Sequence, residues 1–223
     1  MSDAQPAVAP GPACPEAALL EERLPGVVLD VASARGELRI TVERERVVEA
    51  LSLLRDDPAL DYRFFSECLA VDYLDPSTGE PILGKRHRFE VVYNLYSVRD
   101  PATGRGTGRR VFVKVRVPGD DPTVPTVTGV YAGADFPERE VFDLFGIRFE
   151  GHPDLRRILM PDDWIGHPLR KDYPLGGERV QFADGTYGPA ISDRVVQHAG
   201  ESFHGLTGSE AEPAPGRPAT PGL

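Results

Sequence analysis

Apolar residues recur along this chain with two different periods, which predict both helices and strands. Val47, Leu51 and Leu54 follow one another at the spacing of a single helix face. This spacing predicts an amphipathic helix over residues 43–56. The helix should end there because Pro58 disfavours helical backbone at the residue before it.

Runs rich in β-branched and aromatic residues predict the strands. The final run, 110–117, alternates valines with Phe, Lys and Arg, which places its four valines on one face of a sheet. Turn residues separate consecutive runs, so we expect an antiparallel meander with one face on the core. Helices covering that face make the fold class α+β, with a mostly antiparallel sheet. The remaining runs, with a short helix at 19–24 before them, lie at 27–31, 37–42, 63–74 and 88–98.

A further helix of about ten residues is predicted between Asp135 and Gly146. Asp135 and Glu138 are spaced as an N-cap pair, and Gly146 suits the glycine that ends a helix. Arg139 and Asp143 lie four residues apart and are expected to pair on the helix surface. Its apolar face would consist of Val141, Leu144 and Phe145, and its charged positions of Glu138, Arg139, Glu140 and Asp143.

Prolines after this helix predict an extended, Pro-rich C-terminal strap over 150–204. Arg156, Arg157, Arg170 and Lys171 are spaced to contact carboxylates on another surface. Trp164 is either an anchor at an interface or a lid over the protein's own core, and the sequence leaves both open. The predicted organisation is a leader (1–17), an α+β domain (18–149), the strap, and a tail (205–223), with both ends disordered because they are rich in Pro, Ala and Gly.

Composition narrows the possible functions. The chain has 223 residues, of which 40% are hydrophobic, enough for one domain of ordinary size. Its 35 acidic and 25 basic residues argue against a nucleic-acid track and an anionic membrane surface. No apolar run approaches the roughly 20 residues that cross a bilayer, and the N-terminus lacks the features of a secretory signal. We therefore expect a chain that is soluble by itself and reaches a membrane only through other proteins.

The chemistry-bearing residues do not form a familiar catalytic pattern. Cys14 and Cys68 are interpreted as a loose thiol and a buried thiol, too few for an iron–sulfur cluster. His152 and His167 raise a metal hypothesis, with Asp154, Asp162 or Asp163 as further ligands, but their spacing matches no zinc motif. Glu138 and Glu140 lie two apart on a helix and diverge, which argues against an acid/base pair. An independent metal-dependent hydrolase is therefore a remote alternative.

The motif region carries a resemblance to a known family. It reads EREVFDLFGIRFEGHPDLRRIL over 138–159 and DDWIGHPLRKDYP over 162–174. This string resembles the thirty-kilodalton family, the C subunits, of bacterial NADH–quinone oxidoreductase (respiratory complex I). The likeness is dense over 138–174 and weaker upstream, around LAVDY at 69–73, and the Pro/Ala-rich ends have no counterpart in the family core.

The resemblance implies a subunit of a hetero-oligomer on the cytoplasmic side of the cell inner membrane. Such a peripheral-arm subunit docks beside the D, B and I subunits, of which D carries the quinone site. The whole complex passes electrons from NADH through FMN and iron–sulfur clusters to a quinone and pumps protons, and these cofactors belong to the partner subunits. No catalytic, cofactor-binding or metal-binding residue is expected in this chain. The equivalent subunit of a membrane-bound hydrogenase or another donor–quinone complex is the nearer alternative.

The same resemblance implies assembly and interface roles for the motif residues. If so, reversing the charge of Arg156 and Arg157 should weaken subunit association and leave the thermal stability of the domain almost unchanged. The motif residues are Glu138, Arg139, Glu140, Asp143, Gly146, His152, Pro153, Asp154, Arg156, Arg157, Gly166, Pro168, Arg170, Lys171, Asp172, Tyr173 and Pro174.

Overall fold

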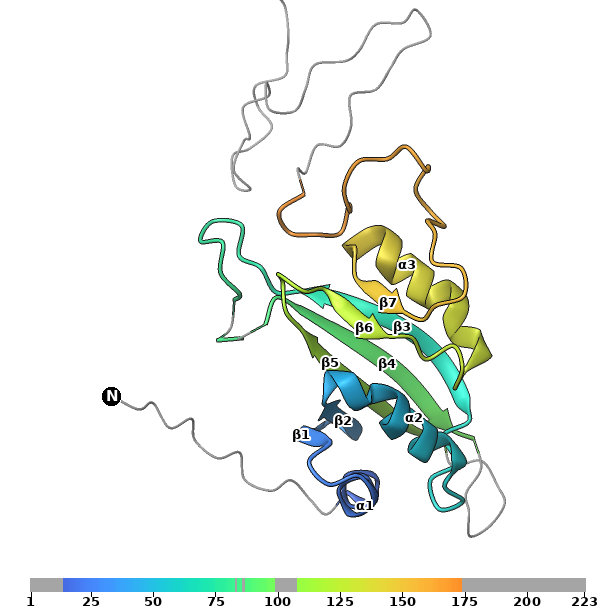
Figure 1. The fold of residues 1–223 in the computed structure, drawn as a ribbon. Helices are drawn as coiled ribbons and strands as arrows, with labels where there is room; N and C mark the ends of the chain where they lie inside the picture. Colours follow the sequence, from blue (N-terminus) through green and yellow to red (C-terminus); the bar gives the residue numbers. More distant parts are fainter. Residues whose placement is uncertain (1–13, 83, 86, 99–107, 174–223) are drawn as a thin grey trace, which may run out of the picture. The chain divides into compact units, whose positions relative to one another are not determined.

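Five strands form one sheet whose spatial order is β1-β2-β5-β4-β3 (Figure 1). A computed structural model describes residues 14–82, 84, 85, 87–98 and 108–173. Within them the elements are α1 (Pro15–Arg23), β1 (Val28–Ala34), β2 (Glu37–Val42), the 3-10 turn η1 (Arg44–Arg46), α2 (Val47–Asp56), β3 (Phe64–Asp72), β4 (Phe89–Ser97), β5 (Arg109–Val117), β6 (Thr123–Pro125), the 3-10 turn η2 (Ala132–Ala134), α3 (Asp135–Phe145) and β7 (Arg148–Glu150).

The sheet is mostly antiparallel, and the α+β class is confirmed, but it is not a simple meander. β1 pairs with β2, and β3, β4 and β5 pair in series, all antiparallel. β2 and β5 are parallel neighbours, with Ile40 opposite Val113. This pairing arises because α2 crosses the sheet and delivers the chain to its far edge, from which β4 and β5 return toward β2 (Figure 1). Local turn signals do not encode such a long-range pairing.

Backbone chemistry sets the element ends. Arg35 and Gly36, with φ of 55° and 79°, make the tight turn between β1 and β2. α2 ends at Asp56 as predicted, but it begins at Val47, because residues 44–46 form η1. Its C-cap, Asp57, is extended with ψ of 124°, as the following proline requires.

The predicted N-terminal leader is too long. α1 begins at Pro15, so residues 15–17 of the predicted leader are helical. Cys14 caps this helix, because its sulfur accepts the N–H of Ala17 over 3.5 Å, and it is therefore not a loose thiol. Glu16 is buried and accepts the Tyr62 hydroxyl over 2.7 Å. Residues 1–13 and the predicted tail over 205–223 lie outside the described residues.

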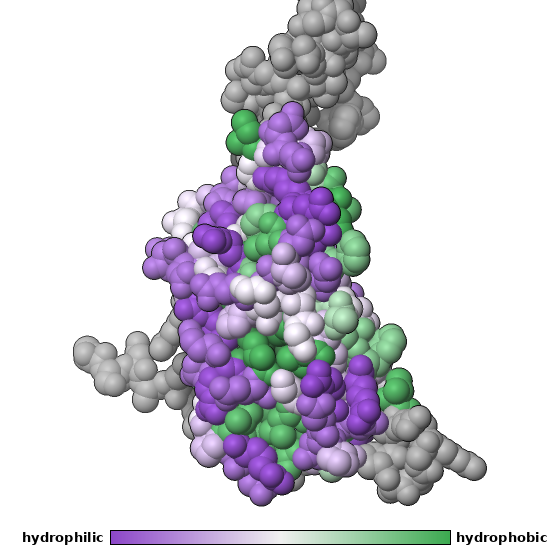
Figure 2. All heavy atoms as spheres, turned by 45° about the vertical axis from the view of Figure 1, so that its right-hand side comes forward, coloured by the Kyte–Doolittle hydropathy of each residue, from purple (hydrophilic) through white to green (hydrophobic). Residues whose placement is uncertain are grey.

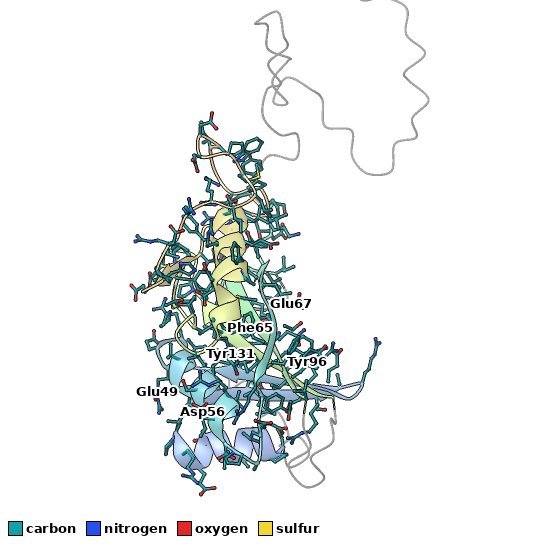
Figure 3. All side chains as sticks on the ribbon, turned by 90° about the vertical axis from the view of Figure 1, so that its right-hand side faces the viewer. Glu49, Asp56, Phe65, Glu67, Tyr96 and Tyr131 are labelled. Atoms are coloured by element: carbon teal, nitrogen blue, oxygen red, sulfur yellow. The ribbon has the colours of Figure 1, made fainter. Side chains whose placement is uncertain are left out.

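The core lies between the sheet and α2. The alternation predicted for β5 is confirmed, since its four valines are fully buried on the α2 side. Figure 3 shows Glu49 and Asp56 of α2 on one side of the sheet and Glu67 and Tyr96 on the other. α3, the helix that carries the start of the motif, lies along β3 (Figure 1). Since β3 is an edge strand, this motif helix packs at the edge of the sheet. Among the described residues, no helix is long and apolar enough to span a bilayer.

Candidate protein-interaction site

The motif helix ends where the strap folds back onto it. We use "strap" for residues 150–173, the described part of the segment predicted over 150–204. Gly146 follows α3 in a left-handed conformation, with φ of 70°, as predicted. A Cβ atom there would lie 2.5 Å from the His167 ring and 2.6 Å from the Arg170 guanidinium. A glycine at position 146 therefore both ends the helix and lets the strap pack closely against it.

Of the four charged positions predicted for α3, Glu140 is exposed and the other three are buried. Glu138 and Asp143 are fully buried and Arg139 is 8% exposed. Asp135 is the first helical residue and no side chain caps the helix, so the predicted N-cap pair is wrong. The predicted Arg139–Asp143 pair is also wrong, because Arg139 donates instead to the carbonyl oxygens of residues 156 and 157, both over 3.3 Å.

Asp143 is the first anchor of the strap. Its Oδ2 accepts the backbone N–H groups of Ile158, Leu159 and Met160 over 3.0, 2.8 and 2.8 Å. Its Oδ1 accepts Nη1 of Arg157 over 2.7 Å. Burial favours the protonated acid, but the three N–H groups and Arg157 outweigh it and hold the pKa of Asp143 below its ordinary value. The turn at 157–160 is thus built around one buried carboxylate.

Arg157 completes this anchor from the strap side. Its Nη2 donates to the carbonyl oxygens of Trp164 and Gly166, each over 3.0 Å, and its side chain is only 17% exposed. The expectation that both adjacent arginines face a partner is therefore wrong for Arg157. Arg156 is different, since its side chain is 69% exposed and pairs with Asp154 over 2.8 Å.

Asp72, at the end of β3, is the second anchor. Its side chain is fully buried and accepts the backbone N–H of Lys171 over 2.9 Å. Arg88 bridges it to the strap, with Nη2 lying 3.0 Å from Asp72 and 2.8 Å from Asp172. The hydrogen bond from Arg88 lowers the pKa of Asp172. Neither Asp72 nor Arg88 was predicted as a site residue, because both lie far from the motif in sequence.

Between the two anchors the strap covers the C-terminal end of α3. The last carbonyl groups of a helix lack partners within it. Here Asp143 O accepts Nδ1 of His167 over 2.8 Å, Leu144 O accepts the N–H of Leu169 over 3.0 Å, and Phe145 O accepts Nε of Arg170 over 2.5 Å. Burial lowers the pKa of His167, which favours the neutral ring as donor.

The two histidines do not meet in a metal site. His167 binds the end of α3, whereas Nε2 of His152 lies 3.2 Å from the carbonyl oxygen of Asp135 at its start. Within the described part of the chain, no group of three or more His, Cys, Asp or Glu side chains could hold a metal ion.

The outward side of the strap is mixed in character. Leu159, Ile165 and Leu169 are 60%, 78% and 50% exposed. Figure 2 shows hydrophobic side chains interspersed among hydrophilic ones on the face that it displays. Pro168, Tyr173 and Trp164 are half-buried, and Pro174 lies outside the described residues. The exposed residues of the motif are Glu140, Pro153, Asp154, Arg156, Gly166, Lys171 and Asp172.

Comparison with known proteins identifies the family. Residues 40–179 match the family model described as respiratory-chain NADH dehydrogenase, 30 Kd subunit. The NADH-quinone oxidoreductase C subunit of Roseiflexus sp. (strain RS-1) is 48% identical over 179 residues, which are 80% of this chain and 90% of that protein. The chain belongs to the 30 kDa subunit family of respiratory complex I. The matched region contains both anchors of the strap.

Other relatives agree with this assignment. NADH-quinone oxidoreductase subunit 5 of Thermus thermophilus is 44% identical over 77% of this chain and 78% of that protein. A solved trypsin-resistant fragment (1-134) of Nqo5 is 40% identical, with a TM-score of 0.50 over 63% of this chain and 98% of the fragment. A chain of the membrane-bound sulfane sulfur reductase, an archaeal respiratory membrane complex, has a TM-score of 0.56 at 25% identity over 71% of this chain and 84% of that chain. The chain thus resembles subunits of more than one respiratory complex.

Proposed function

We propose that this chain is a non-catalytic peripheral-arm subunit of the proton-pumping NADH–quinone oxidoreductase. It lies on the cytoplasmic side of the inner membrane, and its strap docks beside the quinone-site subunit (D), close to the B and I subunits. The observation that carries the proposal is the double anchoring of the strap by Asp143 and Asp72. Two buried carboxylates hold an irregular segment in one shape while its large aliphatic side chains face outward.

This anchoring suits binding better than catalysis. Both oxygens of Asp143 are occupied by backbone N–H groups and Arg157, so the carboxylate has no free position for a substrate. His167 is likewise committed to a helix carbonyl. A prefolded loop also loses little conformational entropy on association, which strengthens binding without new contacts.

The outward residues supply the contact chemistry. Leu159, Ile165 and Leu169 offer apolar area, and Arg156 and Lys171 add exposed positive charge at its margin. Interfaces of this kind combine apolar anchors with a polar rim. We assign Glu140, Asp154, Arg156 and Lys171 to the rim and the buried motif residues to shaping the strap.

The cysteines support a subunit without clusters of its own. Metal clusters bind thiolates, not thiols. Burial raises the pKa of Cys68 well above its ordinary value, and burial raises the pKa of Cys14 to about 11. We therefore place FMN, the iron–sulfur clusters and the quinone in the partner subunits.

Co-purification with the tagged quinone-site subunit tests the proposal. The double variant Ile165→Glu/Leu169→Glu should reduce recovery of that subunit by roughly tenfold or more, because it puts two charges into an apolar contact. Leu29→Glu is a matched control, since Leu29 is 42% exposed on the opposite edge strand and should leave recovery unchanged. Unchanged recovery with the double variant would rule out docking through the strap. Recovery of an NADH- and flavin-binding partner separates this complex from a hydrogenase-type assembly.

A further inference from the structure

Glu138 is a buried carboxyl group whose chemistry the docking role does not use. It lies on α3, five residues before Asp143, and is 0% exposed. Its Oε1 accepts the backbone N–H of Val127 over 2.8 Å, and its Oε2 accepts the hydroxyl of Thr126 over 2.5 Å. Asp143, by contrast, receives three N–H groups and an arginine. Glu138 therefore accepts fewer hydrogen bonds than Asp143, and none from an arginine, to stabilise a negative charge.

No strong cation neutralises Glu138. Of the residues that the structure describes, none of the lysines or arginines forms an ion pair with it, and the nearest basic atom is Nε2 of His152, 4.0 Å away. Nδ1 of His152 accepts the N–H of Asp154 over 3.1 Å, so the hydrogen of the ring sits on Nε2. The two ring nitrogens of His152 thus contact backbone groups of Asp135 and Asp154.

A second carboxyl group, that of Asp135, makes a negative charge on Glu138 still less favourable. Asp135, on the same helix, lies 3.4 Å from the same histidine nitrogen. Burial raises the pKa of Glu138 to about 7, and the charge on Asp135 adds to this effect. The hydrogen bonds from Thr126 and Val127 oppose it. Burial and then the charge on Glu138 raise the pKa of Cys68 on β3, and burial, Cys68 and Glu138 raise the pKa of Tyr93 on β4. The charge on Asp135 favours the protonated form of Glu138, whereas the thiol of Cys68 and the phenol of Tyr93 are uncharged neighbours at neutral pH.

Two hydroxyl groups lead from Glu138 to the surface. The oxygens of Thr126 and Thr128 lie 3.0 Å apart, and either can donate to the other. Both residues line an open hollow of about 530 Å³, together with Asp135 and Gly151. Water in this hollow can therefore reach the second hydroxyl without entering the core.

We infer that Glu138 is a buried proton-binding site and that the hydroxyls of Thr126 and Thr128 carry its proton to and from this hollow. On uptake, the Thr126 hydroxyl hydrogen passes to Oε2 of Glu138 and the Thr128 hydroxyl hydrogen passes to Thr126. A hydronium ion in the hollow then restores the Thr128 hydroxyl and leaves as water. One proton is taken up, the charge of Glu138 changes from −1 to 0, and no oxidant or reductant takes part. This inference stands independently of the docking function.

Carboxyl carbon NMR of the full chain, labelled at glutamate side chains, tests the site. The resonance lost in Glu138→Gln should titrate near pH 7 in the unmodified chain, well above the ordinary glutamate pKa of 4.5. Glu140→Gln is the matched control, because Glu140 is exposed two residues away on α3, and it should remove a different resonance. Titration of the Glu138 resonance together with the bulk of the glutamates would overturn the inference.

Infrared spectroscopy gives a second measurement that needs no variant. At about pH 5.5 most carboxyl groups are ionised, so a carboxylic-acid band that disappears by about pH 8.5 reports a group of raised pKa. We expect such a band, and its absence would contradict the site even if Glu138→Gln did not fold. Thr128→Val tests the relay, since it should leave the midpoint in place and slow exchange between the two forms several-fold. An unchanged exchange rate would overturn the hydroxyl route.

Discussion

The backbone N–H of Lys171 binds the buried carboxylate of Asp72 over 2.9 Å across a sequence separation of 99 residues. This hydrogen bond joins the strap to the end of β3, while Asp143 joins it to α3. Hydrogen bonds to ionised groups contribute more than neutral ones, especially when the ion is buried. The strap is therefore part of the folded domain, and its shape precedes any contact with a partner.

The first prediction concerns the anchor on α3. Asp143→Asn should lower the free energy of unfolding by about 3–5 kcal/mol, because it leaves Arg157 without its counter-charge and turns an amide toward backbone N–H groups. Urea unfolding of the full chain measures this change. Asp154→Asn is the control, since Asp154 is an exposed partner of Arg156 and should cost less than about 1 kcal/mol. Equal effects for the two variants would contradict a structural role for Asp143.

The second prediction concerns the adjacent residues Arg156 and Arg157, whose substitutions should have different effects on stability and on association. Arg157→Glu places two carboxylates together in a buried site and should prevent stable folding or lower the melting temperature strongly. Arg156→Glu should leave the melting temperature nearly unchanged and weaken association with the quinone-site subunit, because its side chain is 69% exposed. Thermal unfolding and co-purification measure the two effects. A melting temperature that falls equally in both variants would show that the arginines are not divided between these roles.

Gly146 gives a test of the close contact between helix end and strap. Gly146→Ala forces a Cβ into a left-handed residue and against the His167 ring, so a loss of about 2 kcal/mol or more is expected. Gly129→Ala is the control, because its added Cβ meets nothing within 4 Å and its φ is not in the left-handed region. Urea unfolding distinguishes them, and a tolerated Gly146→Ala would mean that the strap does not approach the helix this closely.

The pH dependence of stability should report Glu138. Its folded pKa of about 7 lies above the ordinary value of 4.5, so the folded chain binds this proton more tightly than the unfolded chain. Its contribution is therefore fully present below about pH 4.5 and is lost as pH rises to about 7. The loss should be roughly 3 kcal/mol, since each pKa unit corresponds to about 1.4 kcal/mol. The difference in unfolding free energy between the unmodified chain and Glu138→Gln should change by that amount over this range, and a constant difference would contradict it.

The elements of this fold follow from local patterns, but the roles of its charges do not. Helix periodicity and Pro58 locate α2, and valine alternation locates the buried face of β5. Charged residues on a helix are usually solvated, so the pattern assigned Asp143 to the surface. Its partners are backbone N–H groups 15 to 17 residues away in an irregular turn, which have no periodic signature. The parallel β2–β5 pairing was missed for the same reason, because it depends on where α2 directs the chain.

Hydrogen–deuterium exchange of the strap, in the full chain alone and in the assembled complex, tests the central claim most directly. The amides of Ile158, Leu159 and Met160 should already be protected in the chain alone, because Asp143 binds them. Peptides that carry Ile165 and Leu169 should gain protection only in the complex. Fast exchange of the three anchored amides in the chain alone, or no added protection of the strap in the complex, would contradict a prefolded docking strap.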